Sequence, residues 1–233
     1  MLMGQGSLNE SDSRPAGDAW QKRIDQAMAR LRTGKASWIR LLPTNDSSED
    51  VRPRLLLPGS FNPLHRGHVA MASIASDKTA LSLDFELSIT NADKPEVAGD
   101  QLAARLADTV AGQSVDSPAF GISPHGLVLT SLPTFVEKAE VFPGSFFVIG
   151  VDTLVRIADA RFYDDSPAAR DKAIQQIAES GCRFLVFGRV SGNRFLEFRD
   201  LDLPGDLVSL CNAIPGVEFR DDISSSALRE RDM

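Results

Sequence analysis

Short apolar runs alternate with amphipathic stretches from Arg54 towards the C-terminal region, and this alternation constrains the fold more than any other feature of the chain. Several runs are almost continuously apolar, which is typical of strands covered on both faces of a sheet. Strands that alternate with helices predict a parallel, doubly wound sheet. The expected strands are residues 54–59, 84–90, 126–131, 145–150, 182–188 and 217–220.

Helical patterns lie between these strands, and the one at 167–180 carries the clearest end signals. Ser166 is expected as its N-cap, Pro167 stands at its first position, and Gly181 follows its end. We therefore expect an α/β fold: a Rossmann-like, doubly wound parallel sheet of about five to six strands with helices on both faces. The expected helices are 66–77, 100–112, 133–141, 152–159, 167–180 and one that begins near Ser225.

The N-terminal region has a different character. Residues 1–17 are rich in small and polar side chains, which predicts a flexible arm. From Asp18 to Leu31 the apolar side chains recur at helical spacing, which predicts an N-terminal helix. We divide the chain into residues 1–50, a flexible arm and helix, and residues 51–233, an α/β domain. This division places Trp20 and Trp38 outside the predicted core.

Charge and cysteine content exclude several function classes for this chain of 233 residues. A net charge of −7 argues against a general nucleic-acid or anionic-membrane surface. The N-terminal residues lack the apolar core of a signal peptide, and no stretch reaches transmembrane length. Cys182 and Cys211 have no metal-ligand spacing and are typical of reduced thiols. We expect a soluble, cytoplasmic protein without nucleic-acid or membrane partners.

The segment that follows the first strand predicts a phosphate site. The turn is formed by Gly59, Ser60, Phe61 and Asn62. Its small residues allow a ligand to approach the backbone, and the N–H groups and positive dipole end of the next helix favour an anion. His65 and His68 lie on one side of the first helical turn, with Gly67 between them.

Alternative interpretations of this segment are a capping histidine beside a buried one, or a zinc site. No Cys, Asp or Glu stands nearby to complete a zinc coordination set. Other nucleotide-binding and nucleophile motifs are missing. Residues 32–37 echo part of a P-loop, but Ala29 stands where that motif needs glycine. No G-x-G-x-x-G follows a strand, and no G-x-S-x-G elbow occurs.

A second candidate anion site lies near the end of the chain. The hydroxyls and N–H groups of Ser224, Ser225 and Ser226 can cap a helix or bind phosphate oxygens. Arg229 shares a helical face with Ser225 and Ser226, and a guanidinium can hold a phosphate through two hydrogen bonds. Taken alone, these residues also fit an ordinary serine cap with a solvated arginine.

Together, "GSFNPLHRGH" and "ISSSALR" resemble the H-x-G-H and I-S-S-x-x-x-R signatures of the nucleotidylyltransferase superfamily, over residues 54–231. The resemblance is greatest to nicotinamide and nicotinate mononucleotide adenylyltransferases, including their cytidylyltransferase-like group. It rests on "SITNADKP", "FFVIGVDTLVRI" and "FLVFGR". It implies transfer of AMP from ATP to a pyridine mononucleotide, forming a dinucleotide and pyrophosphate. Members often assemble, so a homo-oligomer is also expected.

The resemblance also implies roles for individual residues. Mg²⁺ is expected to bind through the ATP phosphates, largely through water. The catalytic residues would be His65, His68 and Arg229. The nucleotide-binding residues would be Gly59, Ser60, Phe61, Asn62, Gly67, Asp152, Gly188, Arg189, Ser224, Ser225 and Ser226. The acceptor-binding residues would be Asn91, Lys94, Phe162 and Tyr163.

The acceptor is where the sequence departs from this group, which commonly stacks the pyridine ring on a tryptophan in the middle of the chain. Both tryptophans here lie before residue 51, so Phe162 or Tyr163 either takes that role or packs in a loop. Lys94 either contacts the acceptor or is solvated. Two alternative functions stay open: the same chemistry with CTP or with another acceptor, such as phosphopantetheine or a polyol phosphate, and a non-catalytic nucleotide-binding module.

Overall fold

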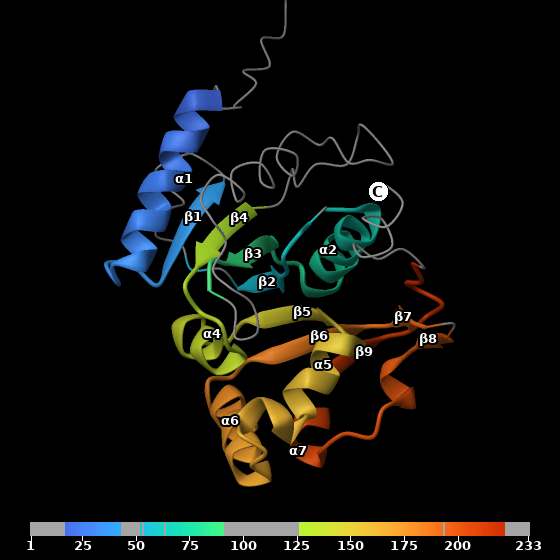
Figure 1. The fold of residues 1–233 in the computed structure, drawn as a ribbon. Coiled ribbons are helices and arrows are strands. Elements are labelled where there is room, and N and C mark those ends of the chain that lie inside the picture. The colour runs from blue at the N-terminus through green and yellow to red at the C-terminus, as the bar shows by residue number, and fades with distance from the viewer. Residues whose placement is uncertain are drawn as a thin grey trace, which may run out of the picture.

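The computed structural model describes residues 17–42, 52, 54–62, 64–90, 126–192 and 194–221, and its centre is a seven-stranded sheet (Figure 1). The strands lie in the order β1-β4-β3-β2-β5-β6-β9. All neighbours are parallel except β1, which runs antiparallel to β4. The strands are β1 (Trp38–Leu42), β2 (Leu55–Pro58), β3 (Asp84–Ser88), β4 (Gly126–Thr130), β5 (Phe146–Gly150), β6 (Arg183–Phe187) and β9 (Cys211–Ile214).

The six parallel strands have the strand order of a Rossmann fold. Numbered along the chain from β2, they lie in the order 3-2-1-4-5-6, so the winding reverses between β2 and β5. Ligands of such sheets bind outside the carboxyl ends of the strands at this reversal point. The predicted doubly wound parallel sheet is confirmed for these six strands, whereas the seventh, antiparallel strand β1 was not predicted. The reversal point lies directly before the His65–His68 segment.

Helices cover both faces of the sheet, as predicted (Figure 1). Leu55 and Leu57 of β2 point into a core shared with α1 and α2, whereas Leu56 points into a second core shared with α4 to α7. The helices are α1 (Gly17–Arg32), α2 (Arg66–Thr79), α4 (Phe135–Val141), α5 (Val151–Ala158), α6 (Pro167–Glu179) and α7 (Gly205–Val208). Short elements complete the described fold: η2 (Ala160–Tyr163), η3 (Phe198–Asp200) and the hairpin β7 (Arg189–Ser191) and β8 (Arg194–Leu196).

The last predicted strand is wrong. Residues 217–220 form a turn and an extended segment, while the edge strand is β9, a few residues earlier. Val217 and Phe219 alternate with polar residues as in a strand, but Val217 is 95% exposed and Phe219 packs edge-on against Phe187. The predicted helices at 100–112 and near Ser225 lie outside the described residues.

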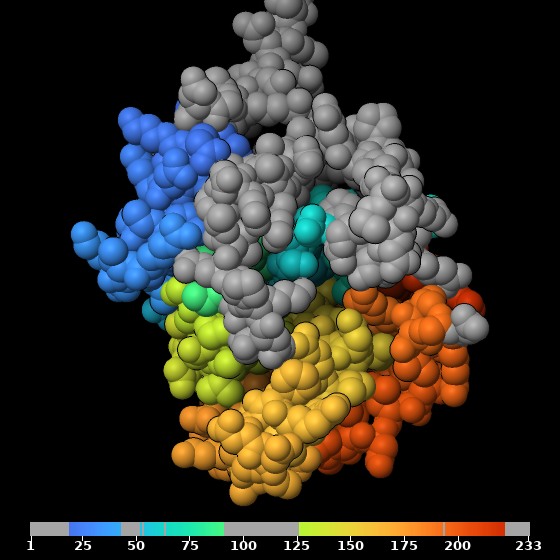
Figure 2. Space-filling model, viewed as in Figure 1, coloured from blue at the N-terminus to red at the C-terminus, as the bar shows by residue number. Residues whose placement is uncertain are grey.

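The N-terminal segment contributes to the core of the sheet. The predicted helix is confirmed as α1, but the expectation that both tryptophans lie outside the core is wrong. Trp20 is buried with Ile24 and Met28 in the first core. Trp38 opens β1, which pairs with β4, and its ring packs edge-on against Phe142 of the second core. In the space-filling view the blue surface of α1 and β1 lies directly against the rest of the molecule (Figure 2).

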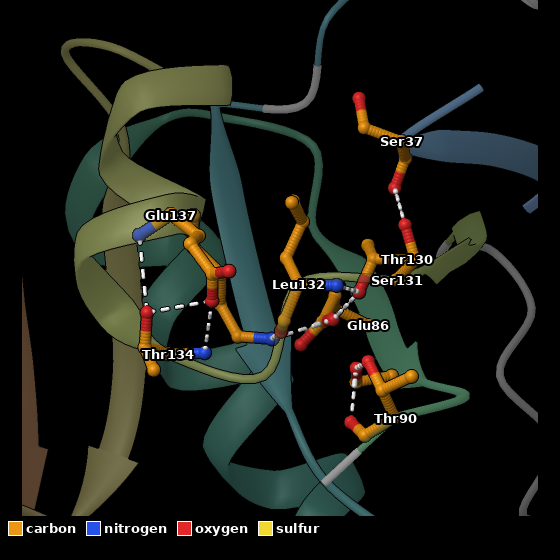
Figure 3. Close-up of polar contacts among 10 residues, drawn as sticks. Ser37, Glu86, Thr90, Thr130, Ser131, Leu132, Thr134 and Glu137 are labelled. Atoms are coloured by element: carbon orange, nitrogen blue, oxygen red, sulfur yellow. Dashed lines mark hydrogen bonds and ion pairs between the residues drawn. The ribbon is translucent and has the colours of Figure 1, made fainter. Parts of the chain in front are cut away.

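A buried polar network fixes the segment that leaves β4 (Figure 3). Glu86 of β3 accepts a hydrogen bond from Nζ of Lys138 in α4 at 2.8 Å and another from Oγ1 of Thr130. The same ammonium donates to the carbonyl oxygen of Leu132 at 2.7 Å. Both charged side chains are almost fully buried, so each compensates the other. The network therefore fixes the chain at the carboxyl end of β4.

Two further contacts hold the same loop (Figure 3). The N–H of Ser131 donates to the carbonyl oxygen of Ser37 at 3.0 Å, which ties the loop to the segment between α1 and β1. Thr134 and Glu137 form a reciprocal capping box at the start of α4, with hydrogen bonds of 2.9 and 3.3 Å. The carboxyl edge of the sheet is thus rigidly built on this side.

Candidate active site

His65 and His68 form the N-terminal cap of α2. Nδ1 of His65 accepts a hydrogen bond from the N–H of Gly67 at 3.2 Å, and the N–H of His65 donates to Nδ1 of His68 at 3.3 Å. This is the geometry of a capping box, with two imidazoles in place of a serine and a glutamate. Because both Nδ1 atoms accept, the N–H of each ring lies on Nε2. Each ring thus closes the cap through one nitrogen and carries a donor on the other.

The environment of the pair keeps His68 uncharged. The two rings lie with their centroids 3.8 Å apart, His65 buried and His68 half-buried. Burial, together with the electrostatic influence of His65 and Arg189, lowers the pKa of His68 to about 3. At neutral pH His68 is therefore a neutral hydrogen-bond donor rather than a proton carrier.

The first-turn N–H groups of α2, which the sequence suggested as anion donors, are partly engaged within the cap. The N–H of Gly67 is bound by the His65 ring, and the N–H groups of His68 and Val69 donate to the carbonyl oxygen of His65 at 3.0 and 3.4 Å. The backbone N–H groups of Gly67, His68 and Val69 are therefore already hydrogen-bonded within the protein. The positive end of the helix dipole still favours an anion here.

Phe61 supports the pair from the core. Its ring is only 2% exposed and lies edge-on to His68 and to Phe85, with ring centroids 5.2 Å apart in each case. A Cβ on Gly59 would lie 2.6 Å from the Phe61 ring, so this position requires glycine. The Phe61 side chain, which was predicted at the nucleotide, instead fixes the His68 ring. Ser60 is exposed in the same turn, and Asn62 is half-buried.

Asp152 and Arg189 follow the carboxyl ends of β5 and β6, the strands on one side of β2. Asp152 lies in the first turn of α5, directly after β5, and its carboxylate binds the Arg189 guanidinium at 2.9 Å. Arg189 follows β6, and its charge acts on His68. A Cβ on Gly188 would lie 2.6 Å from the Phe195 ring, so glycine here allows the β7–β8 hairpin to fold against the end of β6. The structure thus gathers His65, His68, Asp152 and Arg189 at the ends of β2, β5 and β6.

Phe162 and Tyr163 are not brought to the histidine pair. They lie in η2, which follows the last turn of α5, whereas Asp152 lies in its first turn, about 10 Å away along the helix. The Arg156 guanidinium lies 4.8 Å from the centre of the exposed Phe162 ring. Tyr163 donates to the carbonyl oxygen of Ile157 at 3.2 Å, and burial raises its pKa. The structure therefore favours the alternative in which these aromatic residues pack at the end of α5.

Asp221 lies at the site and was missed by the sequence analysis. Its Oδ2 lies 2.6 Å from the point that a Cβ on Gly67 would occupy, and its Oδ1 lies 3.6 Å from the Arg66 guanidinium. Gly67 therefore allows a carboxylate to lie against the first turn of α2. The only signal in the sequence is that an acidic residue directly precedes "DISSSALR". The predicted site residues Asn91, Lys94, Ser224, Ser225, Ser226 and Arg229 lie outside the described residues.

Other features of the described residues do not form a second reaction centre. No three His, Cys, Asp or Glu side chains gather there as a metal site would need. Cys182 and Cys211 are free thiols, and burial raises the pKa of both, that of Cys211 to about 12.

A cavity of about 540 Å³ lies at the other end of α2, between Lys78 and Asn212. Among the described residues no helix combines the length and apolar composition that a membrane crossing needs.

Comparison with known proteins adds one relative. No protein-family model matches the chain. It is 33% identical over 153 residues to a protein of Schizosaccharomyces pombe (strain 972) named "Putative nicotinamide mononucleotide adenylyltransferase". The match covers 59% of this chain and 54% of the relative. The chain is similar to a nucleotidyltransferase. It spans about half the length of that relative. The similarity agrees with the Rossmann-like strand order of the sheet.

Proposed function

We propose that this protein is an adenylyltransferase that transfers AMP from ATP to nicotinamide or nicotinate mononucleotide, forming a dinucleotide and pyrophosphate. The observation that carries the proposal is the capped histidine pair at the reversal point of the sheet, where the uncharged His68 ring lies near the Arg189 guanidinium. The name of the relative supports adenylyl transfer, and "NADKP" and "GVDTL" support the pyridine acceptor.

The chemistry requires positioning and charge stabilisation rather than a general base. An oxygen of the acceptor phosphate attacks the α-phosphorus of ATP, the bond from that phosphorus to the bridging oxygen breaks, and pyrophosphate leaves with the electron pair. In-line positioning alone can supply roughly 7–11 kcal/mol. The imidazole N–H groups and the Arg189 guanidinium stabilise negative charge on the phosphates as the bond breaks. Because the pKa of His68 is about 3, no proton transfer is assigned to it.

The second motif follows closely in sequence after a residue that lies against Gly67. Asp221 lies against Gly67, and Ser224 follows only three residues later. Three residues span at most about 11 Å. This supports a role for Ser224, Ser225, Ser226 and Arg229 in holding the β- and γ-phosphates. The Asp152 carboxylate provides oxygen atoms of the kind that Mg²⁺ prefers, so the donor set fits an ion held mainly by the ATP phosphates.

The nearest alternative is the same transfer to another phosphate-bearing acceptor. It is favoured by the position of Phe162 and Tyr163, the candidate residues for stacking on a pyridine ring. Both lie in η2, at the far end of α5 from Asp152. A non-catalytic nucleotide-binding module is the alternative from another class, since binding would use the same donors.

The test is pyrophosphate release from the full chain with Mg²⁺ and ATP, in separate reactions with nicotinamide mononucleotide, nicotinate mononucleotide and phosphopantetheine. Release is expected with a pyridine mononucleotide. Release with phosphopantetheine alone would identify the alternative acceptor. ATP binding without release in any reaction would contradict the pyridine acceptor and favour the binding module.

Variants of His68 separate catalysis from folding. We expect His68→Ala to lower kcat at least 100-fold while the Kd for ATP changes less than fivefold. His68→Asn keeps an acceptor at the Nδ1 position and hence the cap, but it loses the donor. It should fold as the wild type and be as inactive as His68→Ala. His68→Gln, which restores an N–H near the Nε2 position, should recover part of the activity.

A further inference from the structure

The segment Glu218–Asp221, called here the strap, runs beside α2 and joins β9 to the "ISSSALR" motif. Lys78 in the last turn of α2 binds Glu218 at 2.6 Å, and Arg66 in the first turn lies 3.6 Å from Asp221. Phe219 is buried between these ends, with its ring centroid 5.1 Å from that of Phe187. The strap is therefore fixed at both ends of α2 and in its middle.

The Asp221 carboxylate of the strap lies next to the candidate phosphate site. The Asp221 side chain is only 11% exposed. The space that a Cβ on Gly67 would fill is bounded by Oδ2 of Asp221 at 2.6 Å and by the His65 ring at 3.0 Å. The carboxylate thus lies against the first turn of α2, next to the same ring that the proposed function assigns to ATP. The positive helix end and the Arg66 guanidinium both stabilise an anion at this position.

We propose that Asp221 is an internal competitor for polyphosphate: its carboxylate lies beside the first turn of α2, next to the His65 ring and the Arg66 guanidinium, and the phosphates of ATP displace it together with the strap. This inference rests on the proposed function, because it assumes that phosphates bind at the histidine pair. Two anions within a few ångströms repel strongly where water is largely excluded, so the helix end stabilises one of them at a time. Return of the carboxylate then favours release of pyrophosphate.

The test is the affinity of the full chain for magnesium pyrophosphate, measured by titration calorimetry. We expect Asp221→Asn to bind at least tenfold more tightly than the wild type, because the competing charge is removed and Arg66 is released to the ligand. Glu218→Gln is the matched control, since it removes the other strap ion pair at the far end of α2. Its Kd should stay within twofold of the wild type.

A second measurement needs no variant. Amide hydrogen exchange of residues 218–221 in the wild type should become faster when pyrophosphate is bound, because displacement of Asp221 releases the strap. Unchanged or slower exchange would overturn the inference.

The outcomes separate the two proposals. Equal or weaker pyrophosphate binding by Asp221→Asn would overturn the competitor role while leaving the proposed function intact. If Glu218→Gln bound pyrophosphate as tightly as Asp221→Asn does, the effect would belong to loosening of the strap rather than to the Asp221 charge. That result would also overturn the inference. A wild type that binds neither ATP nor pyrophosphate would overturn both.

Discussion

At the scale of the residue, the cap of α2 explains why two histidines stand three residues apart. A neutral imidazole accepts through one nitrogen and donates through the other, so one ring can close a helix cap and still bind a ligand. An ionised glutamate, the usual N3 partner in a capping box, only accepts and has no such donor. His65 and His68 therefore close the cap of α2 through Nδ1 and keep their ring N–H on the other nitrogen.

The lowered pKa of His68 makes stability depend on pH. Between about pH 6.5 and 3 the unfolded chain binds a proton at this position and the folded protein does not. The free energy of unfolding therefore falls as the pH falls, by up to about 1.4 kcal/mol per pH unit. We expect urea unfolding at pH 7, 6 and 5 to show a steeper loss for the wild type than for His68→Asn. Equal slopes would contradict the assigned environment of His68.

Gly59 provides a second prediction at this scale. Its substitution by alanine would push a methyl group into the Phe61 ring, which in turn supports His68. We expect Gly59→Ala to lower the free energy of unfolding by about 1–3 kcal/mol and to lower kcat as well. Denaturant unfolding and pyrophosphate release measure the two effects. Gly205→Ala is the control, since a Cβ there meets no atom within 4 Å and stability should be nearly unchanged.

At the scale of the element, the pair Glu86–Lys138 between β3 and α4 is one of the buried ion pairs of the sheet. We expect Lys138→Met to lower the free energy of unfolding by about 3–5 kcal/mol, because it leaves the Glu86 carboxylate buried without its cation. The double variant Glu86→Gln/Lys138→Met removes both charges and should recover more than half of that loss. Guanidinium unfolding measures both. A double variant as unstable as the single one would show that the charges are not coupled.

The element scale also shows what the sequence could predict. Strands β2, β4, β5 and β6 could be predicted because they are largely apolar, and β3 because Phe85 and Leu87 alternate with polar residues. The helices between them could be predicted because their end signals are local. Strand β9 was missed because two of its four residues, Asn212 and Ala213, are exposed at the sheet edge. Its position depends on pairing with β6, which no local pattern encodes.

The candidate site could be predicted in part for the same reason. His65 and His68 belong to one contiguous motif, so their proximity follows from helical spacing. The approach of Asp221 to Gly67 joins segments about 150 residues apart, and only the folded chain shows it. The role of Phe61 beneath His68 likewise depends on the tertiary position of Phe85.

At the scale of the whole molecule, residues 17–42 belong to the folded core, so we expect a protein that begins at residue 51 to be severely destabilised. It would lack Ile24, Met28 and Leu41, all fully buried, and the partner strand of β4. Each such side chain contributes about 1.5–3 kcal/mol, against a typical total stability of about 5–15 kcal/mol. Circular dichroism during heating measures this, and an unchanged, cooperative transition would contradict it. Ile24→Ala in the full chain should cost about 2–5 kcal/mol.

The antiparallel edge of the sheet has a consequence during synthesis on the ribosome. Trp38 of β1 pairs with Thr130 of β4, which is translated roughly ninety residues later. At a synthesis rate of about 5–20 residues per second, β4 is made some 5–18 s after β1. During that interval Trp38, Ile39 and Leu41 have no sheet to join, which makes the emerging chain a client for chaperones that bind short apolar segments.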